Sequence, residues 1–199
     1  MRVYTVIFVG LLGLAFGSPG VANEAKIFGS VRLAAVFPSV GSEDARGNRD
    51  AGSEVGFSGG FQLNDWVRWD VADFSYMRNP QSDALAGFYD TFSWSITTNF
   101  RFGDFRPSTK FHPYISGGIG GAQLKIKVDS NYLTKWGMDA NIGFGAEYVV
   151  AEHLAIGVRY RFRWANLNKE IFMPPPYDFL TKADFEINLH TIALEFVFL

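Results

Sequence analysis

The stretch "LAIGVRYRFRW", residues 154–164, alternates strictly between two kinds of side chain. One set of alternate positions carries Leu, Ile, Val, Tyr, Phe and Trp, and the positions between them carry Ala, Gly and three arginines. A period of two residues is typical of a β-strand with one apolar and one polar face. What the chain can fold into therefore depends on whether the apolar face points into a core or outward.

Seven further segments show the same alternation. We expect strands over residues 26–37, 54–63, 66–76, 91–102, 113–126, 137–148, 154–164 and 187–199. The alternation is lost at Asp73 and Phe74, and the faces of the glycine-rich segment 113–126 are ambiguous, with Ile115 and Ile119 assigned to the apolar face. Eight short amphipathic segments without helical periodicity predict an all-β barrel or sandwich.

The predicted connections differ in length in a regular order. Those after the first, third, fifth and seventh segments are long, at residues 38–53, 77–90, 127–136 and 165–186. Those after the second, fourth and sixth are shorter, at residues 64–65, 103–112 and 151–153. Short periplasmic turns and longer extracellular loops are typical of outer-membrane barrels. This order favours a membrane barrel with both termini in the periplasm.

The volume of the apolar side chains indicates which way they point. The apolar faces carry roughly thirty large side chains, whereas an eight-stranded barrel is only just wide enough to be filled by side chains. We therefore predict an eight-stranded antiparallel up-and-down transmembrane β-barrel with apolar faces toward lipid. The alternative is a sandwich or a soluble periplasmic lipocalin-like barrel with these faces inward. Aromatic residues near the strand ends suit interfacial girdles: Trp66, Trp94, Trp136, Tyr148, Tyr160 and Trp164.

The N-terminus has the composition of a secretory signal peptide. Arg2 precedes an apolar run over residues 6–17, which is followed by helix breakers and small residues. We expect a signal peptide over residues 1–22, cleaved after Ala22 or after Ala25, and a barrel domain over residues 26–199. A transmembrane anchor is less favoured because the run is shorter than the ~20 residues that span a bilayer.

Composition excludes several classes of function. A formal net charge of −2 gives no indication of a nucleic-acid partner, and the absence of cysteine excludes disulfides and thiolate metal sites. The three histidines, at 112, 153 and 190, lack the spacing of metal ligands. We therefore expect neither a metal nor a cofactor.

Three segments resemble a known family: "FHPYISGGIGGAQLKI", "WGMDANIGFGAEYVVAEHLAIGVRYRFRW" and the closing "HTIALEFVFL". They are similar to the outer-membrane β-barrel domain family, which includes OmpX-type, OmpA-N-terminal-type and opacity-type surface proteins. The resemblance covers about residues 26–199 and implies a location in the outer membrane of a Gram-negative-type cell. It implies little about activity. Members usually end on an aromatic residue, whereas here Phe198 precedes a final Leu199.

The polar faces predict a charged network in the barrel lumen. Its expected members are Arg32, Arg68, Asp70, Arg101, Asp139, Glu147, Arg159, Arg161, Arg163 and Glu195, with no lysine among them. Guanidinium groups pair with carboxylates through two parallel hydrogen bonds and tolerate partial burial. We expect these residues to plug the lumen. The alternative is a narrow porin-like pore, with a slight anion preference from the surplus of arginine.

The remaining functional surface is the extracellular loops. The last one carries an apolar, proline-containing run that is a candidate interaction patch, formed by Ile171, Phe172, Met173, Tyr177, Phe179 and Leu180. Alternatively, this run covers the barrel mouth or enters the outer leaflet. We expect a monomer with a structural and surface-interaction role, whose partners are outer-membrane lipid, lipopolysaccharide and an extracellular ligand.

Enzymatic function is not expected. Lipid A deacylases, which are small outer-membrane barrels, carry a histidine closely followed by serine on the lipid-facing side. Here His190 is followed by Thr191 and Ile192, with no serine nearby on that strand. A hydrolase needs a nucleophile beside a base, and this strand does not supply that pair.

Overall fold

The structure, a computed structural model, describes residues 26–39, 48–49, 51–83, 87–128, 131–170 and 185–199. The expected signal peptide over residues 1–22 and the candidate patch at residues 171–180 lie outside the described residues. Among the described residues, no helix is both long and apolar enough to cross a membrane.

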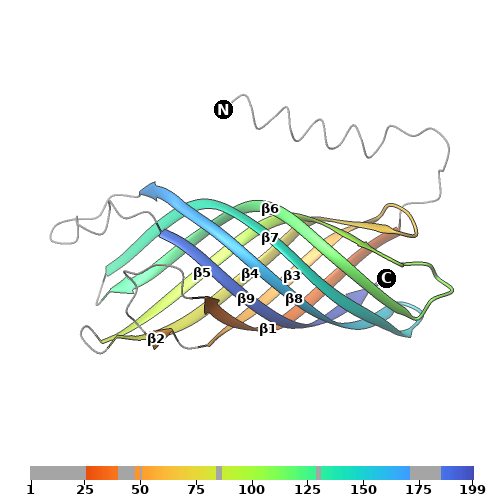
Figure 1. The fold of residues 1–199 in the computed structure, drawn as a ribbon, viewed down its shortest axis with the longest axis horizontal. Coiled ribbons are helices and arrows are strands. Elements are labelled where there is room, and N and C mark those ends of the chain that lie inside the picture. The colour runs from red at the N-terminus through yellow and green to blue at the C-terminus, as the bar shows by residue number, and fades with distance from the viewer. Residues whose placement is uncertain (1–25, 40–47, 50, 84–86, 129–130, 171–184) are drawn as a thin grey trace, which may run out of the picture.

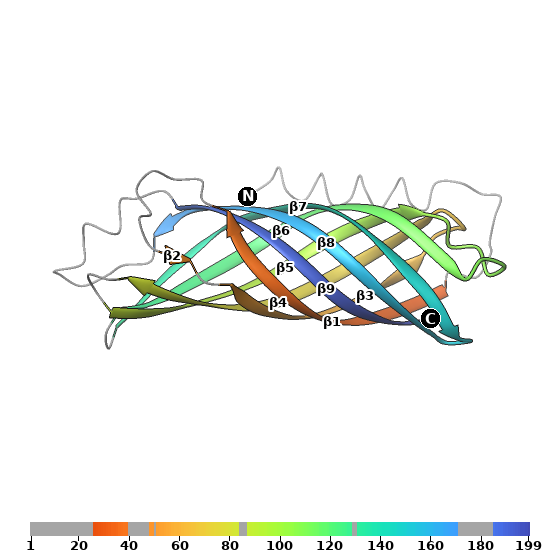
Figure 2. The same ribbon diagram turned by 60° about the horizontal axis from the view of Figure 1, so that its bottom comes forward.

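Eight long strands form a closed antiparallel barrel, as predicted (Figure 1). They are β1 (Lys26–Ser39), β3 (Gly52–Gln62), β4 (Val67–Asp83), β5 (Gly87–Gly103), β6 (Phe111–Val128), β7 (Asn131–Ala151), β8 (Leu154–Glu170) and β9 (Phe185–Phe198). The two-residue β2 (Asn48–Arg49) pairs with β4. Each long strand pairs with the next, and β1 lies against β9, as the turned view in Figure 2 shows. Closure pairs the backbone groups that an open sheet would expose to lipid.

The two ends of the barrel differ in what they carry. β1 begins and β9 ends at one end, which also carries the connections 63–66, 104–110 and 152–153 (Figure 1). We call this the terminal end, and the opposite one the distal end.

The regular order of long and short connections predicted from the sequence is wrong. Only residues 84–86 separate β4 from β5, and only residues 129–130 separate β6 from β7 at the distal end. Most of the expected loops 77–90 and 127–136 are strand. Strand residues beyond the bilayer do not need an apolar residue at every second position, so the sequence alternation fades while the ladder of hydrogen bonds continues.

The apolar faces lie on the outside of the barrel. Val158 is 58% exposed, whereas Arg159 beside it is 1% exposed and points inward. Every long strand contributes exposed large apolar side chains, for example Ile27, Phe57, Val71, Phe102, Ile115, Ile142, Val158 and Ile192. The soluble, lipocalin-like alternative is therefore wrong, because its apolar faces would have to be buried.

The aromatic residues expected near strand ends lie at several levels of the outer surface, and Trp94 and Tyr160 are near the middle of β5 and β8. Trp66, Trp136, Tyr148 and Trp164 are exposed, and Trp94 and Tyr160 are half-buried. The rings of Trp94 and Trp136 meet edge to face with centroids 5.0 Å apart. The positions of Trp66, Tyr148 and Trp136 suit the amphipathic rings of an interfacial girdle, and Trp94 joins them through its contact with Trp136. Tyr160 lies at mid-strand and does not fit the prediction.

A β-bulge in β4 explains the lost alternation at Asp73. Asp70 pairs with Asn99, but Asp73 pairs with Thr97, so three steps along β4 correspond to two along β5. Val71 is the residue without a partner in the register with β3. Because Val71 and Ala72 both face outward, Asp70 and Asp73 both point into the lumen.

Deleting Val71 and Ala72 together should prevent the barrel from folding. Asp70 and Asp73 then become neighbours in the strand, so one of them must turn toward lipid and leave buried arginines unpaired, at a cost of roughly 3–5 kcal/mol. We expect no heat-modifiable folded form on gels under conditions in which the wild type folds. The control, deletion of Val71 alone, removes the bulge but restores the two-residue alternation with both aspartates inward, and it should fold. A double deletion as stable as this control would contradict the need for both aspartates to face the lumen.

Candidate functional site: the charged network of the lumen

The structure places all ten residues of the sequence-predicted network inside the barrel, each with at most 3% of its surface exposed. It adds two buried carboxylates, Glu54 and Asp73, and one buried lysine, Lys135. The expectation of no inward lysine is therefore wrong. Glu54 stood at the edge of its predicted strand, Lys135 fell within an expected loop, and the bulge concealed the orientation of Asp73.

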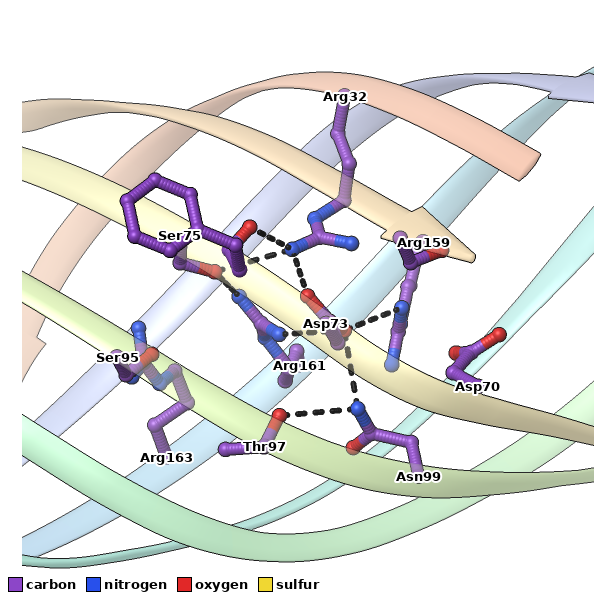
Figure 3. A network of polar contacts seen from close by, with 12 residues as sticks. Arg32, Asp70, Asp73, Ser75, Ser95, Thr97, Asn99, Arg159, Arg161 and Arg163 are labelled. Atoms are coloured by element: carbon purple, nitrogen blue, oxygen red, sulfur yellow. Dashed lines mark hydrogen bonds and ion pairs between the residues drawn. The ribbon is translucent and has the colours of Figure 1, made fainter. Parts of the chain in front are cut away.

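Asp73 is the centre of a cluster in the middle of the lumen (Figure 3). Arg32 donates to its Oδ1, and Nη1 of Arg161 lies 3.3 Å from its Oδ2. Nη1 of Arg159 lies 3.5 Å from the same oxygen, and Asn99 donates to it over 3.0 Å. Three guanidinium groups from β1 and β8 therefore converge on one carboxylate of β4.

Glu54 extends this cluster across the barrel. Its Oε1 accepts hydrogen bonds from Nη2 of Arg161 over 2.6 Å and from the Ser75 hydroxyl over 3.0 Å. Arg163 donates to Asp139 and lies 4.0 Å from the second oxygen of Glu54. We call this set the central cluster; its members are Arg32, Glu54, Asp73, Asp139, Arg159, Arg161 and Arg163.

A second cluster is organised by Arg101 nearer the terminal end. The guanidinium nitrogens of Arg101 lie 3.0 Å from Asp70, 2.8 Å from Glu147 and 2.7 Å from Glu195. Arg68 donates to the other oxygen of Glu147 over 2.6 Å. This set is the terminal-end cluster; its members are Arg68, Asp70, Arg101, Glu147 and Glu195. A single arginine thus bonds three carboxylates that come from three different strands.

Taken together, the two clusters contain as many arginines as carboxylates. Of the described residues, six buried arginines face six buried carboxylates, with Lys135 as one further cation. The central cluster has four arginines for three carboxylates, and the terminal-end cluster has two arginines for three carboxylates. The surplus of arginine inferred from the sequence disappears once Glu54 and Asp73 are included. The near balance fits the high cost of burying an unpaired charge.

Glycines leave the room that these long side chains need. A Cβ added at Gly56 would lie 2.4 Å from Nη2 of Arg32. A Cβ at Gly145 would lie 2.7 Å from the ring and hydroxyl of Tyr114, whose hydroxyl donates to Glu195 over 3.1 Å. Larger residues at these two positions would displace groups that bond within the clusters.

The histidines do not form a site together. His190 lies on the outer surface, where its Nδ1 is 2.6 Å from the hydroxyl of Tyr160. Thr191 points inward, and its hydroxyl donates to the carbonyl oxygen of Arg161. His112 bonds the carbonyl oxygen of Thr109 through Nε2. Within the described ranges, no group of side chains has a metal-binding arrangement.

Replacing Asp73 by Asn should destabilise the barrel strongly. The substitution keeps the shape of the side chain but removes the charge that three arginines share. We expect a loss of about 3–5 kcal/mol in the free energy of unfolding, measured by urea titration in lipid vesicles with tryptophan fluorescence. Asp104→Asn, which breaks an ion pair on the surface of a connection, is the control and should change stability little. Equal effects of the two variants would contradict this account of the central cluster.

Comparisons with known proteins agree with this architecture. A family profile described as the outer membrane protein beta-barrel domain matches residues 8–198. No curated protein gives a significant match. The crystal structure of Neisserial surface protein A shares 14% sequence identity over 88% of this chain and 99% of that chain, with a TM-score of 0.60.

Two further solved structures are similar at lower scores. The N-terminal β-barrel domain of Pseudomonas aeruginosa OprF is 14% identical over 88% of this chain and 100% of its own, with a TM-score of 0.45. The outer membrane enzyme PagL is 15% identical over 84% and 97%, with a TM-score of 0.42. At these identities the likeness concerns the fold alone. Because the profile spans nearly the whole chain, the protein belongs to the outer membrane protein beta-barrel domain family and is an integral protein of the cell outer membrane.

Proposed function

We propose that this protein is a closed, non-conducting outer-membrane barrel with a structural and surface-interaction role. The observation that carries the proposal is that ion pairs join strands on opposite walls. Arg161 of β8 bonds Asp73 of β4, and Arg101 of β5 bonds Glu195 of β9. Each pair joins strands four apart in an eight-stranded ring, which is the widest separation available. A conducting pore needs a continuous water-filled path, and these bonds lie across it.

The pore alternative is disfavoured by the charge balance of the lumen. Its anion preference depended on a surplus of arginine, and six carboxylates match the six arginines among the described residues. Lys135 is the one further buried cation in these ranges. An eight-stranded interior filled by side chains is also too narrow for free passage of solutes.

Planar bilayer recording tests the closed lumen. We expect the purified wild-type protein to give no reproducible single-channel steps, because both clusters fill the cross-section. Heat-modifiable mobility of protein recovered from the same bilayers confirms that it has inserted and folded. Large, uniform current steps from folded protein would overturn the proposal.

The outer surface supports a non-enzymatic role. His190 pairs with the phenolic hydroxyl of Tyr160, and the hydroxyl of the neighbouring Thr191 is directed into the lumen. The histidine therefore lacks the adjacent aliphatic hydroxyl that a Ser–His type hydrolase uses as its nucleophile. An unchanged lipid A mass spectrum on overexpression is the expected result, and a deacylated product would contradict it.

Basic residues beyond the aromatic girdle support lipopolysaccharide as a partner. Tyr76, Trp94, Gln123 and Trp136 occupy one row across β4 to β7. Arg78 and Lys125 are exposed two residues further toward the distal end, and both pair with the same residue of β5. Their backbones are therefore about 10 Å apart. Two cations at this level suit the phosphates of outer-leaflet lipid.

The connections at the distal end are the proposed surface for an extracellular ligand. The support comes from the sequence of residues 171–180, whose apolar run is unusual for a connection exposed to water. Loops held by a rigid barrel are a common place for binding residues.

Deleting residues 171–180 separates the structural role of the barrel from the proposed binding role of its distal connections. The barrel should keep its heat-modifiable mobility, because neither cluster includes residues of this segment. Adhesion of cells that display the protein should fall to the level of cells without it. Unchanged adhesion by the folded deletion variant would refute the binding role and leave the closed barrel unaffected.

A further inference from the structure

An aromatic ring from a connection lies inside the barrel at the terminal end. The connection 104–110 joins β5 to β6, and Phe105 is its only aromatic residue. Phe105 is 2% exposed, whereas the next residue, Arg106, is exposed. A phenylalanine in a connection at the aqueous end of a barrel has no reason to be buried unless the barrel itself receives it.

The backbone on both sides of Phe105 is tied to the neighbouring connection. The amide of Phe105 donates to the carbonyl oxygen of Asp65 over 2.7 Å, and the side chain of Gln62 donates to the Phe105 carbonyl oxygen over 3.2 Å. The amide of Gly103 donates to the carbonyl oxygen of Trp66 over 3.0 Å. These bonds hold the connection against the neighbouring connection 63–66 on both sides of the ring.

The ring covers the outermost charge of the terminal-end cluster. The guanidinium carbon of Arg68 lies 4.2 Å from the centroid of Phe105 and 5.5 Å from that of Phe28 on β1. The rings of His112 and Tyr114 lie 5.9 Å and 6.3 Å from Phe105. The guanidinium of Arg68 therefore contacts two aromatic rings and is shielded from water, which strengthens its pairing with Glu147.

Apolar residues complete this layer around Phe28. Ala155 and Val197 are fully buried against it, and Leu199 packs on the same group. The amide of Leu199 donates to the carbonyl oxygen of His153, which holds the last residue of the chain at this mouth. The terminal end thus has an apolar layer outside its charged cluster.

We propose that Phe105 is a stopper that closes the terminal-end mouth and keeps water and ions from the terminal-end cluster. The inference rests on the proposed closed lumen and adds a second, separate barrier to it. The charged clusters block the middle of the barrel, and the ring of Phe105 seals the end at which β1 begins and β9 ends.

The absence of cysteine from the chain makes the test direct. A cysteine placed at Ala155 reports on the layer beside the stopper, and a cysteine at Ala193 reports on the lumen beyond Glu195; both alanines are buried. The folded single-cysteine proteins are reacted with a charged, membrane-impermeant thiol reagent in lipid vesicles permeabilised to the reagent. The measured quantity is the rate of labelling.

Phe105→Ala should speed labelling at position 155 by at least about tenfold, which corresponds to about 1.4 kcal/mol of local opening free energy. Phe105→Leu fills part of the space and should label at an intermediate rate, which keeps the test usable if the alanine variant does not fold. Phe111→Ala is the matched control, because it removes an exposed aromatic ring at the same end, and it should label as slowly as the wild type.

The two reporters separate the stopper from the closed lumen. Equal labelling rates at position 155 with Phe, Leu and Ala at position 105 would overturn the stopper. Rapid labelling at position 193 in the protein with Phe105 intact would overturn the closed lumen instead. Slow labelling at 193 together with rapid labelling at 155 in Phe105→Ala is the result expected if both barriers exist.

Discussion

A buried charge must be paired, and this requirement governs the interior of the barrel. A guanidinium or carboxylate removed from water loses several kcal/mol of hydration, which only close, well-directed partners restore. Asp73 forms ion pairs with three arginines, and Arg101 forms ion pairs with three carboxylates. Each of the two residues is therefore the centre of its cluster. The network joins opposite walls of the barrel, and these bonds are the basis of the closed lumen that we propose.

The outer face of the barrel contacts lipid instead of water, and this contact determines its residues. Acyl chains offer no hydrogen-bonding partners, so the sheet is closed and its outward side chains are apolar through the membrane. Interior glycines such as Gly56 and Gly145 leave space for long charged side chains within a narrow cylinder. The two faces of each strand are thus adapted to two environments, and neither set of residues could replace the other.

The fold was predictable because lipid imposes a strict pattern. Every second residue must be apolar where a strand crosses the bilayer, and the number of large side chains decides that they point outward. The orientation of Val158 and Arg159 follows from these two facts, and the structure agrees. The same reasoning placed most of the charged lumen residues on the inward face.

The residues that the sequence did not predict lie where a strand no longer needs an apolar residue at every second position. Asp73 is directed inward by a bulge that the sequence shows only as a lost alternation. Lys135 lies in β7, at a position that the sequence pattern assigns to a loop. The pattern fails there because the strand continues to pair without an apolar face. The burial of Phe105 depends on hydrogen bonds between two connections, which no short-range pattern encodes. Glu54 stood at a strand boundary, where pattern is weakest.

The distribution of the ion pairs along the sequence has a consequence for biogenesis. Arg32 and Asp73 are 41 residues apart, Arg101 and Glu195 are 94 apart, and Arg161 and Glu54 are 107 apart. Arg32 and Asp73 are separated by β3 alone, but the other two pairs join strands that stay far apart until the sheet closes. Some pairs form within one hairpin, such as Arg101 with Asp70. A hairpin entering the bilayer by itself would still carry other charges into hydrocarbon without their counter-ions, such as Glu147 of β7, whose arginine partners are on β4 and β5. We therefore expect insertion to be cooperative, with the seam between the first and last strands forming before the charged face loses its water.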